Sequence, residues 1–142
     1  MSTRSRIIYL KENGTAEWIY CHWDGYLDYA GKILNCYYRT PDIVKKLIKL
    51  GDISSLGTTP ETKKGEDNPE EKNLYGFPLY TVSYNSWRDE PINIHKEKSL
   101  GNCLNDLLTA WEEFFYIFDE KQSEWHVVEP RMLKYLEEVK IG

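Results

Sequence analysis

Two short apolar stretches, RIIYL at residues 6–10 and AEWIYCH at residues 16–22, are joined by a turn that begins with KENG at residues 11–14. The Asn-Gly pair in this turn is typical of a tight β-hairpin, because glycine adopts a positive φ without steric cost. Both stretches are rich in β-branched and aromatic residues, which favour strands. The sequence therefore predicts an antiparallel hairpin at this point of the chain.

Two helices are expected directly after this hairpin. Across residues 30–38 the apolar side chains recur at positions i, i+3, i+4, i+7 and i+8, which is the pattern of one buried helical face. Asp28 can accept hydrogen bonds from the first N–H groups of that helix. Thr40 and Pro41 are typical of the start of a second helix, and Gly51 is typical of its end.

The second half of the chain predicts further strands and helices. The expected elements are a strand through residues 78–84, a turn at 85–91, a return strand at 92–95, a helix at 100–111, a hairpin of 114–118 with 125–128, and a last helix that opens at Pro130 and includes Met132, Leu133, Leu136 and Val139. The strands are gathered in hairpins and do not alternate with helices. We therefore expect an α+β fold, with an antiparallel sheet of about five or six strands covered by three or four helices.

Residues 58–73, TTPETKKGEDNPEEKN, contain no aliphatic or aromatic side chain. Such a segment cannot bury enough apolar surface to offset the entropy lost on ordering, so we expect a mobile polar loop within a single domain that spans residues 1–142. The sequence leaves open whether this loop is a surface insertion or closes over a site.

The composition excludes several classes of partner. The chain has 142 residues and a net charge of −5, from 18 Lys and Arg against 23 Asp and Glu. Duplex nucleic acid is bound through an excess of positive charge, so we expect no such partner, whereas a few arginines can still bind a small anion. No stretch approaches the ~20 apolar residues of a membrane helix, so we expect no association with a membrane. Three cysteines without framework spacing indicate reduced thiols in a cytosol.

Catalytic and metal-binding motifs are absent from the sequence. It contains no G-x-S-x-G, P-loop, G-x-G-x-x-G or H-E-x-x-H pattern, and its Cys and His residues lack C-x-x-C or H-x-x-x-H spacing. Cys21 and His22 are neighbours, but neighbouring side chains of a strand point to opposite faces and cannot share a proton. We therefore expect a binding protein that is not an enzyme and holds no metal or cofactor. A hydrolase with paired carboxylates is the enzyme class that the sequence leaves open.

The stretch YCHWDGY at residues 20–26 is the first candidate ligand site. Aromatic, imidazole and carboxylate groups gather there at a strand end, beside a glycine turn and the start of a helix, which together suit a phosphate and a stacked base. The alternative is that the aromatic residues close the core and the aspartate caps a turn. The candidates from this corner are His22, Trp23, Asp24 and Tyr26, with Arg4 and Arg6 on the paired strand.

The stretch YNSWRD at residues 84–89 is the second candidate site. Trp and Arg are enriched at binding hot spots, since a guanidinium can hold a phosphate by two hydrogen bonds while an indole stacks on a purine. The alternative is a surface ion pair of Arg88 with Asp89, with Trp87 folded onto the sheet. The candidates here are Tyr84, Trp87 and Arg88, and Asn93 and Arg131 complete the set as an amide for ribose hydroxyl groups and a guanidinium for phosphate.

The motifs STRSRI at residues 2–7, IYCHWDGY at 19–26, GKIL at 31–34 and LIKLGDISSLG at 47–57 occur in this order. The series resembles a group of small phage and prophage proteins, and within that group the phage Thoeris anti-defence protein 1 family. The likeness covers residues 2–57, with a weaker likeness over residues 114–128. It identifies no ligand contact residue by residue.

This resemblance implies a specific function. Proteins of the family sequester the cyclic ADP-ribose isomer (glycocyclic ADP-ribose) that Thoeris TIR proteins make as an alarm signal, and they do not cleave it. The family forms dimers that assemble further, with the ligand at a subunit interface, and some members also bind cyclic oligonucleotides at a separate site. By resemblance we expect such a ligand, a homodimer or higher homo-oligomer, and the cytoplasm of an infected bacterium. The competing hypothesis is a phage inhibitor that binds a host protein directly through aromatic surface.

Overall fold

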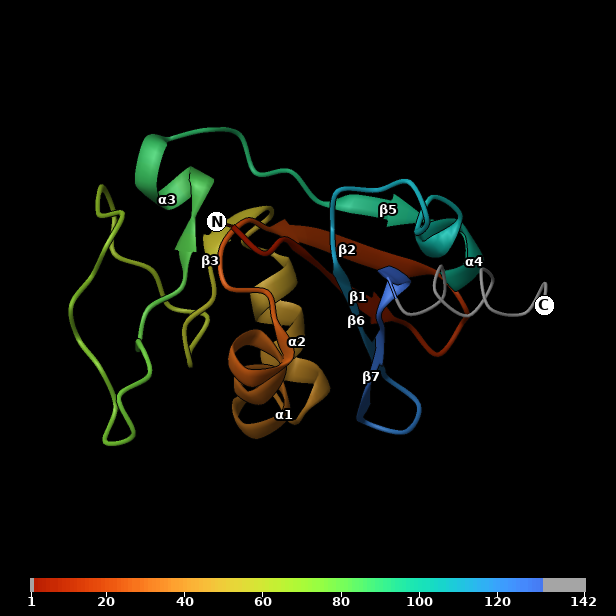
Figure 1. The fold of residues 1–142 in the computed structure, drawn as a ribbon, viewed down its shortest axis with the longest axis horizontal. Coiled ribbons are helices and arrows are strands. Elements are labelled where there is room, and N and C mark those ends of the chain that lie inside the picture. The colour runs from red at the N-terminus through yellow and green to blue at the C-terminus, as the bar shows by residue number, and fades with distance from the viewer. Residues whose placement is uncertain (1, 132–142) are drawn as a thin grey trace.

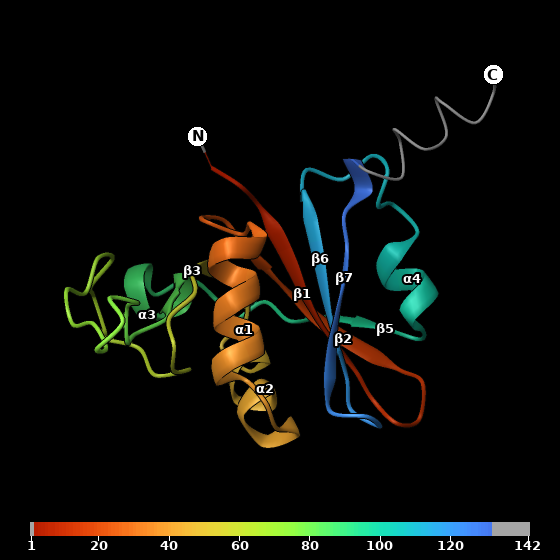
Figure 2. The ribbon, with the colours of Figure 1, turned by 60° about the horizontal axis from the view of Figure 1, so that its bottom comes forward.

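The computed structural model describes residues 2–131, which form an α+β fold with helices on both faces of an open sheet (Figures 1 and 2). The elements are β1 (Ser5–Leu10), β2 (Ala16–Cys21), a π-helical turn η1 (Leu27–Gly31), α1 (Lys32–Tyr37), α2 (Pro41–Ile48), β3 (Ile53–Ser55), β4 (Val82–Ser83), α3 (Tyr84–Arg88), β5 (His95–Glu97), α4 (Leu100–Leu104), β6 (Phe114–Asp119) and β7 (Glu124–Val128). The strand order is β4-β3-β2-β1-β6-β7, and β5 pairs with β2 beside this path. The expected α+β class is confirmed.

Strands β1 and β2 form the antiparallel hairpin that the sequence predicts, with Ile7 opposite Ile19. Gly14 has a φ of +90° in the connecting turn, a conformation that glycine adopts most readily. The second expected hairpin is also confirmed, because β6 and β7 pair antiparallel with Ile117 opposite His126. Local turn signals were therefore sufficient to place four of the strands.

The sheet is mixed, and its parallel pairs depart from the expected antiparallel arrangement. Strand β1 pairs in parallel with β6, with Ile7 opposite Tyr116, and β2 pairs in parallel with β3 at Cys21 and Ile53. A parallel pair requires a long crossover connection, which here runs through helices and loops. No turn sequence marks such a pair, so the local pattern contained no sign of it.

The central strands are buried on both faces. In β1, Ile7 and Tyr9 face α1 and α2, whereas Ile8 belongs to a second core with Phe115 and Ile117. Figure 2 shows α1 and α2 on one side of these strands and α4 on the other. Alternate residues of one strand therefore serve two separate cores.

The first helix expected in the first half of the chain differs in detail from expectation, and Tyr26, without a side-chain cap, takes the position expected for Asp28. The single helix expected at residues 30–38 begins with the π-helical turn η1 and continues as α1, while Thr40 precedes α2 with Pro41 at the first helical position. The fully buried Tyr38 hydroxyl donates a hydrogen bond of 2.8 Å to the carbonyl oxygen of Gly57.

No helix within residues 2–131 has the length and apolarity needed to cross a membrane.

The strand expected through residues 78–84 is reduced to β4, and the expected turn after it is the short helix α3. The Ser83 side chain accepts a hydrogen bond of 3.0 Å from the Ser86 N–H, and the Ser83 N–H donates one of 3.2 Å to the Ser86 hydroxyl. This reciprocal cap stabilises a helix start and outweighs the strand-like alternation of the sequence. The return strand lies later than expected, as β5, and pairs with β2.

The helix expected at residues 100–111 is shorter than its apolar pattern indicates. Only α4 is helical, and the following residues form turns, including a hydrogen bond of 2.8 Å from the Ala110 N–H to the Asp106 carbonyl oxygen. Trp111, expected on the buried face, is 80% exposed. The helical side chains expected after Arg131, from Met132 to Val139, lie outside the described residues.

The polar loop of residues 58–73 runs beside α3 and β4 (Figure 1). The Thr58 N–H donates a hydrogen bond of 2.8 Å to the Pro78 carbonyl oxygen, and the Gly65 N–H donates one of 2.7 Å to the Ser86 carbonyl oxygen. These bonds attach the loop to α3 and to the strand-like segment before β4. Its mobility stays a prediction.

A buried arginine connects β1 to the segment after α4. Arg6 is 5% exposed, and its guanidinium lies 2.8 Å from the Glu112 carboxylate and 3.0 Å from the Asp106 carboxylate. It also lies 3.9 Å from the ring centre of Trp18. Because Glu112 is itself 7% exposed, Arg6 is the group that compensates its buried charge.

We predict that Arg6→Leu destabilises the fold by about 3–5 kcal/mol, because Glu112 would be left buried without its partner. Urea unfolding measures this free energy. The control is Arg39→Leu, which removes an exposed arginine that bonds Asn35, and it should change stability by less than about 0.5 kcal/mol. An Arg6→Leu protein that unfolds at the wild-type urea midpoint would contradict the assignment.

Candidate functional site

A cavity of about 410 Å³ lies where the end of β2 meets β3, α3 and the polar loop. Trp23 and Asp24, from the first candidate stretch, line it together with Trp87 from the second. Asp67 and Asn68 line it from the polar loop. Two stretches that lie far apart in the sequence therefore contribute to one cavity.

The pairing of β2 with β3 positions the first stretch. The His22 N–H donates a hydrogen bond of 3.2 Å to the Ile53 carbonyl oxygen, and the Trp23 N–H donates one of 2.9 Å to that of Ser54. The Asp52 carboxylate accepts a hydrogen bond of 2.8 Å from the Tyr20 N–H. The strand is thereby held to its neighbour up to the edge of the cavity.

A tight turn comes next, at Asp24 and Gly25. Asp24 has a φ of +56°, a left-handed conformation that is uncommon outside glycine and often found at functional sites. A side chain at Gly25 would lie 2.6 Å from the Ser5 Cβ and 2.9 Å from the Thr3 carbonyl oxygen, so only glycine fits there. The turn therefore has one geometry available, and it places Asp24 at the cavity wall.

A second close approach lies behind the cavity. A Cβ atom added to Gly57 would lie 2.3 Å from the Tyr80 carbonyl carbon, so the two backbone segments are in direct contact. The Thr81 hydroxyl accepts a hydrogen bond of 3.0 Å from the Gly57 N–H and donates one of 2.8 Å to the Thr59 carbonyl oxygen. Tyr80 lines the cavity from this supported segment.

The second stretch forms α3 and presents a stack of planar groups. Trp87 stacks on Tyr84 with ring centres 6.2 Å apart, and the Arg88 guanidinium lies 4.5 Å from the Trp87 ring centre. Arg88 forms its ion pair with Glu90, at 2.8 Å, and not with Asp89, its partner in the alternative interpretation. Trp87 is half-buried, so it both packs on the fold and lines the cavity.

The lining gives this cavity a definite chemical character. Its lining combines the aromatic rings of Trp23, Tyr29 and Trp87 with the carboxylates of Asp24 and Asp67. No lysine or arginine of residues 2–131 lines it. Planar uncharged groups can stack on the rings, and hydroxyl or amino groups can donate to the carboxylates, but a phosphate would meet like charge.

Three of the predicted site residues lie outside the cavity, namely Arg4, Tyr26 and Arg131. Arg4 lines a hollow of about 290 Å³ with Tyr20, Trp111 and Glu112. Tyr26 and Arg131 share another hollow, of about 320 Å³, where Arg131 lies 2.8 Å from Glu113. The sequence candidates are thus spread over three depressions.

Arg6 and Asn93 have structural roles. The Arg6 guanidinium is buried between Glu112 and Asp106, so the structure places it outside the cavity. The Asn93 side-chain amide donates a hydrogen bond of 3.0 Å to Asp52, which also contacts His95 at 3.1 Å. Both residues are already engaged by carboxylates of the fold.

His22 lies between the cavity and the hollow of Arg4. Its Nδ1 shares a hydrogen bond of 2.8 Å with the Tyr20 hydroxyl, and its ring meets that of Trp23 edge-on at 4.7 Å. Burial, and secondarily the charge of Arg4, hold the pKa of His22 below its usual range. The neutral ring is therefore favoured at pH 7.

The sequence interpretation missed several lining residues, namely Tyr29, Ser54, Asp67, Asn68 and Tyr80. Asp67, Asn68 and Pro69 form an Asp-Asn-Pro run, which is a turn signal without any indication of a ligand. Ser54 lies within the quoted motif LIKLGDISSLG, whose role the sequence alone does not define. Asp67 and Asn68 join the site only through the path that the loop takes beside α3, whereas Tyr29 comes from η1 and Ser54 from β3.

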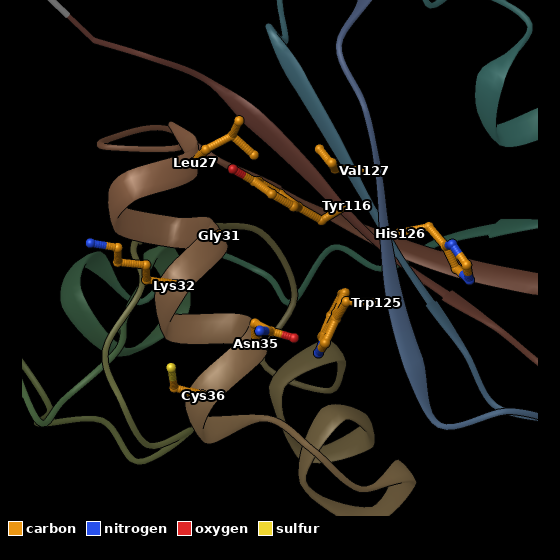
Figure 3. A pocket seen from close by; sticks show the side chains of 9 residues that line it. All are labelled: Leu27, Gly31, Lys32, Asn35, Cys36, Tyr116, Trp125, His126 and Val127. Atoms are coloured by element: carbon orange, nitrogen blue, oxygen red, sulfur yellow. The ribbon is translucent and has the colours of Figure 1, made fainter.

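Another pocket, of about 300 Å³, lies between α1 and β7 and contains none of the candidate residues. Figure 3 shows Leu27, Asn35 and Trp125 around it, while His126 points to the far side of β7. Trp125 is held there by a hydrogen bond of 2.7 Å from its indole N–H to the Tyr38 carbonyl oxygen. Figure 3 shows Cys36 and His126 apart from each other, so among these lining residues they do not form a nucleophile–base pair.

The cysteines do not form a catalytic pair with histidine in the described part of the chain. Burial raises the pKa of the Cys21 thiol to about 12 and that of Cys103 to about 11. The Cys21 sulfur contacts the Trp23 carbonyl oxygen at 3.5 Å, whereas the His22 ring is bonded to Tyr20. Residues 2–131 contain no cluster of three or more His, Cys, Asp or Glu side chains suited to a metal ion.

Comparison with known proteins finds no matching family model, no matching curated protein and no matching solved structure. The likeness to the Thoeris anti-defence protein 1 family therefore stays an expectation from the quoted motifs. The geometry of the cavity is independent of that likeness and can support a functional proposal by itself.

We predict that iodoacetamide modifies native protein at Cys36 alone. With a pKa of about 12, only about one Cys21 thiol in ten thousand is ionised at pH 8, and Cys21 and Cys103 are also fully buried. Cys36 is exposed. Intact mass should show one adduct on native protein, three after denaturation, and none on native Cys36→Ser. Rapid labelling of native Cys21 would show an activated thiol and would revive the nucleophile hypothesis.

Proposed function

We propose that this protein binds and sequesters a cyclic ADP-ribose-type immune signal, glycocyclic ADP-ribose made by Thoeris TIR proteins, and does not cleave it. The observation that carries the proposal is the single cavity shared by Trp23, Asp24 and Trp87. The resemblance of residues 2–57 to the Thoeris anti-defence family supplies the identity of the ligand. The proposed setting is the cytoplasm of an infected bacterium.

The cavity suits the nucleoside part of such a ligand. Its volume of about 410 Å³ falls in the range of small-molecule pockets. The indole rings of Trp23 and Trp87 provide faces on which an adenine can stack. Asp24 and Asp67 can accept hydrogen bonds from ribose hydroxyl groups, and Asn68 can donate or accept.

Sequestration requires slow release, which a closed and largely preformed pocket provides. The glycine contacts at Gly25 and Gly57 preform two walls of the cavity. We propose that a second copy of the chain completes the enclosure, as the resemblance to a dimeric family suggests. Sedimentation of the complex would report that stoichiometry.

The carboxylates of Asp24 and Asp67 also define the enzymatic alternative. A hydrolase of glycosidic bonds places two carboxyl groups on either side of the bond, one as acid and one as base or nucleophile. In the proposed role these groups only accept hydrogen bonds from ribose. The state of the ligand after release separates these two roles.

A second candidate function is direct inhibition of a host protein. Leu74 and Tyr75 support it, because they are 100% and 81% exposed in the turn that follows the polar loop. Exposed apolar side chains that neighbour each other are typical of protein contacts. A host protein captured in stoichiometric amount through Tyr75, with no small molecule retained, would favour this function.

We predict that calorimetry with glycocyclic ADP-ribose gives binding in the micromolar range or tighter, and that Trp87→Ala weakens it roughly 5- to 150-fold. This range corresponds to the loss of about 1–3 kcal/mol of stacking on one base. The control is Tyr75→Ala, which removes an exposed aromatic ring outside the cavity and should leave affinity unchanged. Absence of binding heat with wild-type protein would reject the proposal.

We further predict that ligand released by heat denaturation is chemically unaltered. Liquid chromatography with mass detection compares the released compound with the one supplied. Recovery of linear ADP-ribose or smaller fragments would show that the site is catalytic, and Asp24→Asn together with Asp67→Asn would then identify the acting carboxylates.

A further inference from the structure

The hollow lined by Arg4, Tyr20, Trp111 and Glu112 has a volume of about 290 Å³. Trp111 is 80% exposed there, which is unusual for so large an apolar side chain. The Arg4 guanidinium lies 5.4 Å from the centre of its ring. A cation and an exposed aromatic face are thus presented together to solvent.

The Arg4 guanidinium forms no ion pair with a carboxylate of residues 2–131, in contrast to most other arginines, so it is free to bind a ligand. Arg6, Arg88 and Arg131 each form such an ion pair. Glu112 is the one carboxylate lining the hollow, and Arg6 holds it at 2.8 Å. Arg6 shares its charge between Glu112 and Asp106, so the hollow has no net positive charge, and the unpaired Arg4 guanidinium is the group that it offers to an anion.

A continuous row of aromatic contacts connects this hollow to the cavity. Tyr20 lines the hollow and shares a hydrogen bond of 2.8 Å with His22. The His22 ring meets Trp23 edge-on at 4.7 Å, and Trp23 lines the cavity. The ring centres of Tyr20 and His22 lie 5.9 Å apart and those of His22 and Trp23 lie 4.7 Å apart, so the row is short enough for the two parts of one dinucleotide-sized ligand.

The cavity and the hollow differ in charge. Asp24 and Asp67 disfavour phosphate in the cavity, while Arg4 attracts it to the hollow. Arg88, which the sequence offered for phosphate, is paired with Glu90 and lies over Trp87. Arg88 is thus placed to orient the indole ring, and its charge is already neutralised.

On the basis of the proposed function, we propose that the hollow of Arg4, Tyr20 and Trp111 is the subsite for the diphosphate of the ligand, separate from the cavity that takes its nucleoside. The Arg4 guanidinium donates hydrogen bonds to phosphate oxygens. The Tyr20 hydroxyl donates one as well when the neutral His22 ring carries its proton on Nδ1 and donates it to the Tyr20 oxygen. The exposed Trp111 ring forms one wall of the subsite beside the Arg4 guanidinium.

The test is calorimetric titration of glycocyclic ADP-ribose into single variants at about 50 and 200 mM salt. Arg4→Gln should bind at least about tenfold more weakly, because a hydrogen bond to a charged group contributes about 1.5–3 kcal/mol. It should also lose most of the salt dependence, since that dependence reports the charge contact. Arg4→Lys should fall between Arg4→Gln and wild type. Trp111→Ala, at a position that is 80% exposed, should also weaken binding.

Arg39→Gln is the matched control, because it removes the same charge from an exposed arginine that bonds Asn35. It should bind within about twofold of wild type. If wild type binds but Arg4→Gln and Trp111→Ala keep wild-type affinity, the subsite is wrong and the proposed function stands. If Arg88→Gln is instead the variant that loses affinity and salt dependence, the diphosphate binds at α3 and the subsite is wrong. If wild type does not bind, the proposed function itself fails.

Discussion

The carboxylate of Asp52 joins the two parts of the structure that form the cavity. It accepts a hydrogen bond from the Tyr20 N–H at 2.8 Å, binds the Asn93 amide at 3.0 Å and contacts His95 at 3.1 Å. These bonds fix the end of β2 against β3 and the segment that leads into β5. Two walls of the cavity adjoin that junction, because Trp23 and Asp24 continue β2 while β4, which pairs with β3, leads into α3.

The resulting surface separates charge around the end of β2. The cavity contains rings and carboxylates, the hollow of Arg4 contains a cation and an exposed indole, and His22 lies between them. A ligand with an uncharged base, ribose hydroxyl groups and a diphosphate has the complementary distribution of charge. Recognition by such a division gives specificity, since a nucleoside without phosphate, or a phosphate alone, satisfies only half of the surface.

Local signals in the sequence were sufficient for the two hairpins, for α2 and for three residues of the cavity, Trp23, Asp24 and Trp87. The parallel pairs of β1 with β6 and β2 with β3 had no local signal, because they depend on contacts far apart in the chain. The alternation before α3 predicted a strand, but the reciprocal hydrogen bonds of Ser83 and Ser86 decided for a helix. Arg6 was proposed as a ligand contact, yet its burial beside Glu112 makes it structural. The loop contribution depended on tertiary packing, which composition does not encode.

The most direct test of the account is the electron density of the protein crystallised with glycocyclic ADP-ribose. The account predicts one intact ligand per cavity, with its base against the rings of Trp23 and Trp87 and its diphosphate beside Arg4. Density for the base at any other place on the protein, or for a hydrolysed fragment in the cavity, would contradict it.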